Sequence, residues 1–333
     1  MGPAQRATAA TPMAEGCRRV PYTDARAFLE RCRSRPERMR VLCSTKASRD
    51  GGDQLAVTVE VAPGGPEVEV REVCMAEGWT GCRFSPAALW LALELAHEGR
   101  VGEGACGGLE ALDDPKGSLR PRALELGCGV ALVGLTAHAL GFETTLTDCL
   151  PGHLRSLSVH CGAGSATPRP DLRVRRLDWL EEEGSGSCSV DTGSPENVGA
   201  ATTEWPGLGP EERQSFDLVV ASDVLYEEHH AVLLPAVVAR WLKPGGAWAF
   251  SFAIRDAPML VRFLEGMRAH GLLLDHAGSA TWETACSPGR CTYCRGRMDD
   301  CGGREDAPLF TRLRELVEGH EGGAVLIRGR RPR

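Results

Sequence analysis

The sequence predicts an α/β protein whose doubly wound parallel sheet is preceded by a β-hairpin. From residue 122 onward, short apolar strand patterns alternate with helix patterns, which is typical of a parallel sheet covered by helices. Several strand patterns, such as FDLVVA at 216–221, are apolar throughout, as expected for strands buried on both faces. A glycine turn at 127–129 joins the first of these strands to its helix. We therefore expect ligands at the carboxyl ends of the strands.

The first part of the chain is predicted to stand outside this sheet. Residues 1–50 are rich in arginine and are predicted to be a weakly structured basic segment with one helix at 24–32. A β-hairpin follows at 55–73, because valines alternate with polar residues on both sides of the Pro-Gly-Gly-Pro turn at 63–66.

A buried helix and a linker complete the segment 51–121. Ser85 is a good N-cap, Pro86 is a good first helical residue and Gly99 is a good stop, so a helix is predicted between them. This helix is apolar on nearly all sides, which indicates burial. Residues 99–121 carry glycine, aspartate and proline and are predicted to be a linker.

The main domain is predicted to span residues 122–333, with insertions at 181–213 and 285–308. The predicted strands are 123–126, 144–147, 172–177, 216–221, 247–254, 272–276 and 324–328. The predicted helices are 132–140, 152–160, 228–242, 258–270 and 310–317.

The second insertion contains four cysteines with spacing that raises the question of a metal site. Cys286, Cys291, Cys294 and Cys301 form a C-x4-C-x2-C-x6-C pattern, and four thiolates can bind zinc in tetrahedral geometry. The first and last spacings are loose, and the chain has 14 cysteines in all. We therefore predict no metal, and zinc at this cluster is the alternative.

Composition argues against several classes of protein. The 333 residues are 42% hydrophobic, and no run approaches about 20 apolar residues, so no membrane partner is expected. The net charge is −7 although the first 49 residues are basic. This basic N-terminal segment lacks the interleaved aromatic residues that favour nucleic-acid binding, so we expect no nucleic-acid partner. Scattered cysteines without a secretory signal indicate reduced thiols, and hence a cytoplasmic protein, with the nucleus as the alternative.

The glycine turn, ELGCGVA at 125–131, indicates the class of ligand. Glycine lets the backbone approach a ligand where a Cβ atom would collide. A dinucleotide fingerprint would need its third glycine at Leu132, which argues against a nicotinamide cofactor. The pattern [E/D]-x-G-x-G-x-G of S-adenosylmethionine enzymes is matched up to Ala131, which stands in place of the last glycine.

An acid follows the turn at the distance that both cofactor classes require. Asp148 ends the second strand, 21 residues after Gly127, and its carboxylate could accept hydrogen bonds from ribose hydroxyls. The alternative role for Asp148 is to cap the helix after Pro151.

Three downstream motifs favour S-adenosylmethionine over a nicotinamide. LDW at 177–179 follows the third strand, where an adenine would lie, and SDVLY at 222–226 follows the fourth strand. LKPGG at 242–246 is predicted to be a turn between a helix and a strand, where methyltransferases often carry it.

With these motifs in order, the chain resembles the class I, seven-stranded S-adenosylmethionine-dependent methyltransferases. More narrowly, it resembles the methyltransferase family 16 of protein-lysine methyltransferases. The resemblance covers residues 55–280 and the last strand, and implies a Rossmann-like seven-stranded methyltransferase sheet. The motifs that carry it are TGCRFSPAA at 80–88, LELGCGVALVGL at 124–135, LTD at 146–148, LDW at 177–179, FDLVVASDVLYEEH at 216–229 and LKPGG at 242–246.

The resemblance implies S-adenosyl-L-methionine as the cofactor and a lysine-containing protein as the substrate. The family usually has tryptophan where this chain has Ser85, and glycine where it has Ala131. The predicted cofactor contacts are Glu125, Gly127, Cys128, Gly129, Asp148, Asp178, Trp179 and Ser222. The predicted catalytic residues are Asp223 and Tyr226.

Asp223 is expected to orient a lysine amine and Tyr226 to form a wall of its channel, while burial removes the proton from the amine. Two alternatives stay open. One is methylation of a small molecule or another nucleophile, and the other is an inactive cofactor-binding module. His229 and His230 are predicted to be surface residues of an early helical turn rather than a general base.

Overall fold

The computed structural model describes residues 41–47, 53–60, 67–72, 81–82, 85–98, 120–161, 170–183, 205–280 and 324–333. Several predicted features lie outside these ranges. They are the helices at 24–32 and 310–317, the hairpin turn at 63–66, most of the linker at 99–121 and the cysteine cluster at 286–301.

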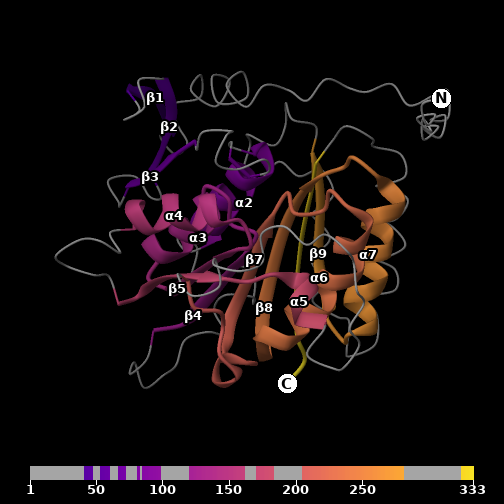
Figure 1. Ribbon diagram of the computed structural model, residues 1–333. Helices are drawn as coiled ribbons and strands as arrows, with labels where there is room; N and C mark the ends of the chain where they lie inside the picture. Colours follow the sequence, from indigo (N-terminus) through magenta and orange to yellow (C-terminus); the bar gives the residue numbers. More distant parts are fainter. Residues whose placement is uncertain are drawn as a thin grey trace, which may run out of the picture.

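The described part of the chain contains a seven-stranded sheet (Figure 1). The order across it is β6-β5-β4-β7-β8-β10-β9. All seven predicted strands are confirmed, and they form the doubly wound, Rossmann-like sheet that was predicted. The strands are β4 Arg122–Leu126, β5 Glu143–Asp148, β6 Leu172–Arg176, β7 Phe216–Ser222, β8 Leu242–Ala253, β9 Leu273–Ala280 and β10 Ala324–Arg330.

The sheet is mixed, whereas the strand–helix rhythm predicted a parallel one. β10 lies between β8 and β9 and runs antiparallel to both. The reason is visible in the pairing of Ala324 with Ala280, the first residue of β10 and the last residue of β9. β10 therefore begins beside the point where β9 ends, and two neighbouring strands joined in this way run antiparallel.

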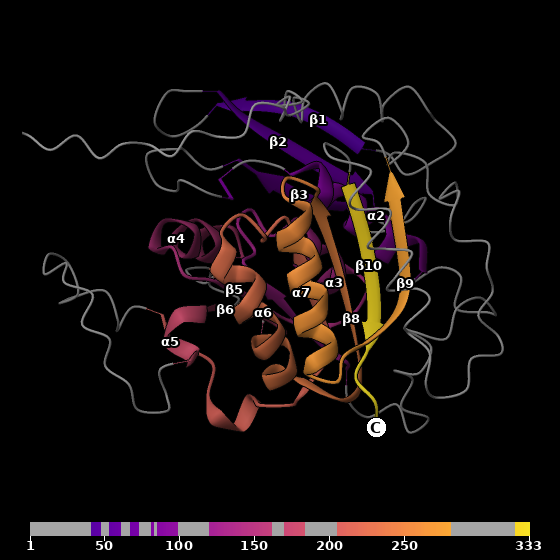
Figure 2. The same ribbon diagram turned by 90° about the vertical axis from the view of Figure 1, so that its right-hand side faces the viewer.

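Helices cover both faces of the sheet (Figure 2). Leu218 and Val220 of β7 belong to the core cluster on the side of α2 and α3, and Val219 and Ala221 belong to the cluster on the side of α6 and α7. Side chains alternate between faces along a strand, so the apolar run of β7 is buried on both faces, as predicted. The covering helices are α2 Pro86–Glu98, α3 Leu132–Ala139, α4 Pro151–His160, α6 Glu228–Trp241 and α7 Ala257–Ala269.

None of the helices in the described ranges is long and apolar enough to cross a lipid bilayer.

A separate antiparallel sheet, with the order β1-β2-β3, precedes the main one in the chain (Figure 2). β2 Asp53–Glu60 and β3 Glu67–Arg71 confirm the predicted hairpin. β1 Val41–Ala47 corrects the prediction that residues 1–50 are weakly structured throughout. This strand is stabilised by pairing with the free edge of β2, a contact that its own sequence does not encode.

Two predicted irregular segments are more ordered than expected. The insertion predicted at 181–213 is structured at both ends, because α5 Trp179–Glu183 includes its first residues and the 3-10 helix η2 Pro210–Glu212 lies near its end. The stretch 242–246, predicted to be a turn, is the irregular start of β8, where its register with β7 shifts.

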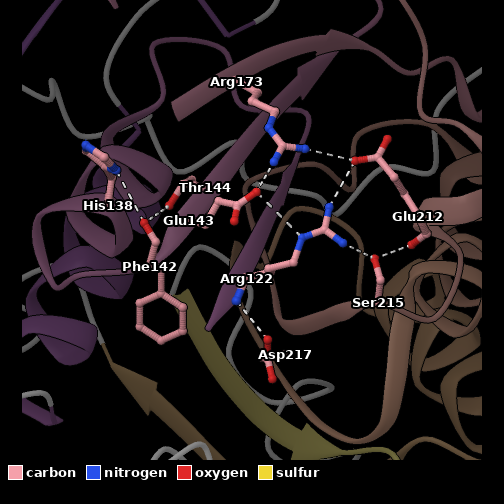
Figure 3. Close-up of polar contacts among 9 residues, drawn as sticks. All are labelled: Arg122, His138, Phe142, Glu143, Thr144, Arg173, Glu212, Ser215 and Asp217. Carbon is pink, nitrogen blue, oxygen red and sulfur yellow. Dashed lines mark hydrogen bonds and ion pairs between the residues drawn. The ribbon is translucent and has the colours of Figure 1, made fainter. Parts of the chain in front are cut away.

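A network of ion pairs and hydrogen bonds joins the amino-terminal ends of several strands of the sheet (Figure 3). Arg122 at the start of β4 contacts Glu212 at 3.0 Å and Glu143 at 3.9 Å. Arg173 of β6 pairs with the same two acids. The main-chain N–H of Arg122 also donates to Asp217 of β7 at 2.7 Å. The network lies at the opposite end of β4 from the glycine turn. It therefore joins β4, β5, β6, β7 and η2 without occupying the predicted site.

Candidate functional site

The carboxyl ends of β5, β4 and β7 bring most of the predicted site residues to one edge of the sheet. β4 lies between β5 and β7 and pairs in parallel with both. The chain passes from β4 outward to β5 and β6 and then returns to β7 on the other side, so this is a topological switch point. In open α/β sheets, ligands bind in the crevice outside such a point.

The glycine turn after β4 is tightly enclosed. Gly127 has a φ of 60° and Gly129 has a φ of 50°, both in the left-handed region that glycine tolerates. A Cβ atom on Gly127 would lie 2.9 Å from Val224 Cγ1 and 3.3 Å from the ring of Trp179. A Cβ atom on Gly129 would lie 2.6 Å from the carbonyl oxygen of Gly81. Both positions therefore require glycine for backbone conformation and for space.

Ala131 adopts the backbone conformation that the missing third glycine would supply. It is the N-cap of α3, with φ 61° and ψ 29°, and it is fully buried. Its N–H donates to the carbonyl of Cys128 at 2.6 Å. The turn therefore keeps its left-handed geometry despite the alanine, at the cost that an L-residue incurs there.

Glu125 faces the interior of the protein. It is 1% exposed, and its Oε2 accepts a hydrogen bond from the N–H of Gly134 in α3 at 2.9 Å. Burial raises the pKa of this carboxyl from 4.5 to about 8, with a further contribution from the charge of Asp148. These contacts give Glu125 a role in joining β4 to α3 and offer no support for its prediction as a cofactor contact.

Asp148 is linked directly to the glycine turn. Its two carboxylate oxygens accept hydrogen bonds from the N–H groups of Gly129 and Leu150, each at 3.0 Å. The N–H of Cys128 donates to the carbonyl of Thr147 at 2.9 Å. The bond to Gly129 holds Asp148 against the glycine turn. The bond to Leu150 is a local contact and not the helix cap that was the alternative, because α4 has no side-chain cap hydrogen bond.

His153 is a residue at this edge that the sequence did not single out. It is 1% exposed, and its Nδ1 lies 3.2 Å from Asp148 Oδ2. This distance fits an ion pair, but neither ring nitrogen has a hydrogen bond of good geometry within the described ranges. A histidine five residues after the strand-end acid carries no recognisable pattern, so its place here became visible only in the structure.

Trp179 lies against the turn, whereas Asp178 points into local structure. The Trp179 ring is buried beside Gly127, and its indole N–H has no hydrogen-bond partner among the described residues. Asp178 accepts from the N–H of Leu180 at 3.1 Å and pairs with Arg176 at 3.4 Å. Asp178 therefore stabilises the start of α5, and its prediction as a cofactor contact stays a prediction.

Asp223 occupies a strained and fully engaged position after Ser222, the last residue of β7. Its φ is 57°, which is uncommon for a residue other than glycine and concentrates at functional sites. Its carboxylate accepts two hydrogen bonds from Arg255, at 2.6 and 2.8 Å, and one from the hydroxyl of Ser85 at 2.9 Å. Ser85, the departure from the family pattern, is thus a partner of the predicted catalytic acid.

Tyr226 lies in the segment that joins β7 to α6. Its ring packs edge-on against His230, with the centroids 4.3 Å apart, and it is 42% exposed. Burial of the hydroxyl raises its pKa to about 12, with contributions from the charges of Cys149 and Asp148. Tyr226 therefore contacts the ring of His230, while Asp223 pairs with Ser85 and Arg255.

No protein-family model and no curated protein matches the chain. Among solved structures, it is similar to a protein from Galdieria sulphuraria described as a sarcosine dimethylglycine methyltransferase, with 15% identity, coverage of 74% of this chain and 85% of that one, and a TM-score of 0.40. It is also similar to an S-adenosylmethionine-dependent methyltransferase from Mesorhizobium loti (19% identity, 67% and 95%, TM-score 0.35). A third is a geranyl diphosphate C-methyltransferase from Streptomyces coelicolor (13% identity, 65% and 73%, TM-score 0.36). Similarities this distant carry no argument about activity or substrate.

Proposed function

We propose that this chain is an S-adenosylmethionine-dependent methyltransferase that acts on a lysine side chain of a protein. The observation that supports this most is the glycine turn at the switch point. Gly127 and Gly129 are left-handed, and the N–H of Gly129 is bonded to Asp148 on the neighbouring strand. Such a turn with a strand-end acid beside it is the arrangement that binds a nucleoside at this edge of an α/β sheet.

Two features of the site fit an adenosyl cofactor. The N–H groups of Gly129 and Leu150 each take one acceptor position on Asp148, and His153 Nδ1 lies 3.2 Å from Oδ2. A carboxylate has about four such positions, so Oδ1 could still bind a ribose hydroxyl. The indole N–H of Trp179 is a buried donor whose partner is missing from the described part of the chain, and such donors are normally paired. Asp148 would hold the ribose and Trp179 would border the adenine. When bound, the cofactor supplies an activated methyl group.

The environment of Asp223 suits an amine substrate. A lysine amine has a pKa of about 10.4, so removing its proton at pH 7 costs about 4.6 kcal/mol. An isolated carboxylate beside the amine would add to that cost. The guanidinium of Arg255 offsets the charge of Asp223. Asp223 can therefore orient the lysine amine while raising the pKa of that amine less than an isolated carboxylate would. One contact of Arg255 would have to open, because Arg255, Ser85 and the N–H of Ala253 together already give each oxygen of Asp223 two hydrogen bonds.

Tyr226 offers an exposed aromatic face at the same edge. Aromatic faces attract cations, and a methylated lysine regains its positive charge once the reaction is complete. We therefore propose that Tyr226 lines the lysine channel and favours the cationic product.

The engaged state of Asp223 also supports a second candidate, an inactive module that binds the cofactor. In that case the contacts of Ser85 and Arg255 with Asp223 would be permanent, and the residue would only shape the end of β7. The two candidates differ in whether methyl groups are transferred.

Transfer of a radiolabelled methyl group from S-adenosylmethionine into a cell lysate tests the proposal. The wild-type chain should label a protein band, and Asp223→Ala should lower the labelling at least about tenfold, the equivalent of one lost interaction of 1.4 kcal/mol. Asp171→Ala is the matched control, since this acid pairs with Arg120 at the opposite edge of the sheet, and should label normally. Label confined to small molecules would reject the lysine substrate, and absence of label with cofactor bound would support the inactive module.

A further inference from the structure

Three side chains capable of binding a metal gather at the start of α6. Within the described ranges, Glu227, His229 and His230 each offer one ligand atom, and these atoms all lie within 4.8 Å of one another. Glu227 is exposed, His229 is partly buried and His230 is buried. The sequence predicted two surface histidines here. That prediction is wrong for His230, which is buried against the rings of Trp179 and Tyr226.

His230 has the properties of a histidine that lacks a partner. It is 6% exposed, and its Nδ1 is buried without a hydrogen bond to any described residue, which is costly for a polar atom. The carbonyl of Val224 accepts a hydrogen bond from the ring, a second contact of the kind that orients metal-binding histidines.

The spacing of the other two ligands already suits a small divalent ion. Glu227 Oε2 lies 3.3 Å from His229 Nδ1. With bonds of about 2.0–2.1 Å in tetrahedral geometry, ligand atoms lie about 3.3 Å apart. Glu227 and His229 therefore lie at the separation that an ion between them would require. The ligand nitrogen of His230 lies within 4.8 Å of both other ligand atoms and would move closer to them when an ion binds.

We propose that Glu227, His229 and His230 form a binding site for a divalent transition-metal ion, with Zn²⁺ as the expected occupant. Two imidazoles and one carboxylate are a donor set that zinc uses, and the fourth position is left to water or another ligand. Hard ions such as Mg²⁺ and Ca²⁺ prefer oxygen ligands and are disfavoured by the two imidazoles.

The position of the site suggests what a bound ion would do. The His230 ring packs against Tyr226, with centroids 4.3 Å apart, and against Trp179, with centroids 5.2 Å apart. An ion on His230 would fix this ring and, through it, two aromatic walls of the edge described above. This inference concerns ion binding, and it stands whether or not the chain transfers methyl groups.

Titration of the full-length, chelator-treated protein with Co²⁺ tests the site, followed by competition with Zn²⁺. Co²⁺ takes zinc positions and reports its ligands by absorption, because thiolates give intense charge-transfer bands that histidine and carboxylate do not. This separates the site from the cysteine cluster at 286–301. His229→Ala and Glu227→Gln remove the two outer ligands without opening the core. Glu228→Gln is the matched control, since Glu228 is an exposed acid of the same turn.

The wild type and Glu228→Gln should bind one Co²⁺ that shows no thiolate bands and is displaced by Zn²⁺. His229→Ala and Glu227→Gln should each weaken this binding at least about tenfold, since even second-shell changes cost that much, while their melting temperatures without metal stay near the wild type. Equal Co²⁺ affinity in all four proteins would overturn the proposal. So would Co²⁺ bound solely through thiolates, in which case Glu227 and His229 form an ordinary ion pair.

Discussion

Ala131 preserves the left-handed geometry of the glycine turn although it stands where the pattern has glycine. Its φ of 61° places an L-residue in the left-handed region, which costs roughly 1–2 kcal/mol. Its methyl group is fully buried, and burial of such a group returns about 0.8 kcal/mol. The turn therefore carries some strain at the point where it enters α3, and the strain is partly offset by packing.

Replacement of Ala131 by glycine should leave stability unchanged or raise it by up to about 1 kcal/mol, because relief of the left-handed strain exceeds the loss of the methyl group. Ala137→Gly is the matched control. Ala137 is equally buried in α3, and glycine there should cost about 2 kcal/mol through helix propensity and lost burial. Urea denaturation of both variants measures the difference. Equal losses in the two proteins would show that Ala131 is not strained.

At the scale of elements, the buried Glu125 joins β4 to α3. The carboxyl accepts a hydrogen bond from the N–H of Gly134 in the first turn of α3, so one side chain joins the strand and the helix that flank the glycine turn. Its pKa of about 8 in the folded chain, against 4.5 when unperturbed, makes this joint sensitive to pH. Between these two values the folded state keeps a proton that the unfolded state has lost. The free energy of unfolding therefore falls as pH rises, by up to about 1.4 kcal/mol per unit.

Glu125→Gln should remove this dependence, because the amide keeps an acceptor for Gly134 and never ionises. Its free energy of unfolding should exceed that of the wild type by an amount that grows between about pH 5 and pH 8 and levels off above. Denaturation curves at several pH values measure this, with Glu228→Gln as the surface control. A difference that is constant with pH, or that shrinks towards alkaline pH, would contradict the raised pKa.

At the scale of the whole molecule, local sequence predicted most of the fold. Strands such as β7 and helices such as α7 were found because their apolar patterns are complete within one element. β1 was missed because its pairing partner, β2, lies outside its own sequence. The direction of β10 was missed because it depends on where a long connection re-enters the sheet.

The sequence predicted which residues belong to the site, but it did not predict the contacts that these residues make. The turn, Asp148 and Asp223 were singled out from motifs, and the structure places them at one edge of the sheet. The hydrogen bond between Ser85 and Asp223 joins residues 138 positions apart, and Arg255 enters from the end of β8. No periodic pattern links such positions, because only the packing of α2 and β8 beside β7 brings them together.

Calorimetric titration of the full-length chain with S-adenosylmethionine is the most direct test of the central claim, that the turn at Gly127–Gly129 and Asp148 bind a nucleoside cofactor. We predict one binding site in the wild type. Asp148→Asn should weaken the affinity about 10- to 150-fold, because hydrogen bonds to a charged group contribute about 1.5–3 kcal/mol. Asp171→Asn, at the opposite edge, should bind as the wild type does. Absence of binding to the folded wild type, or equal affinity in Asp148→Asn, would contradict the claim.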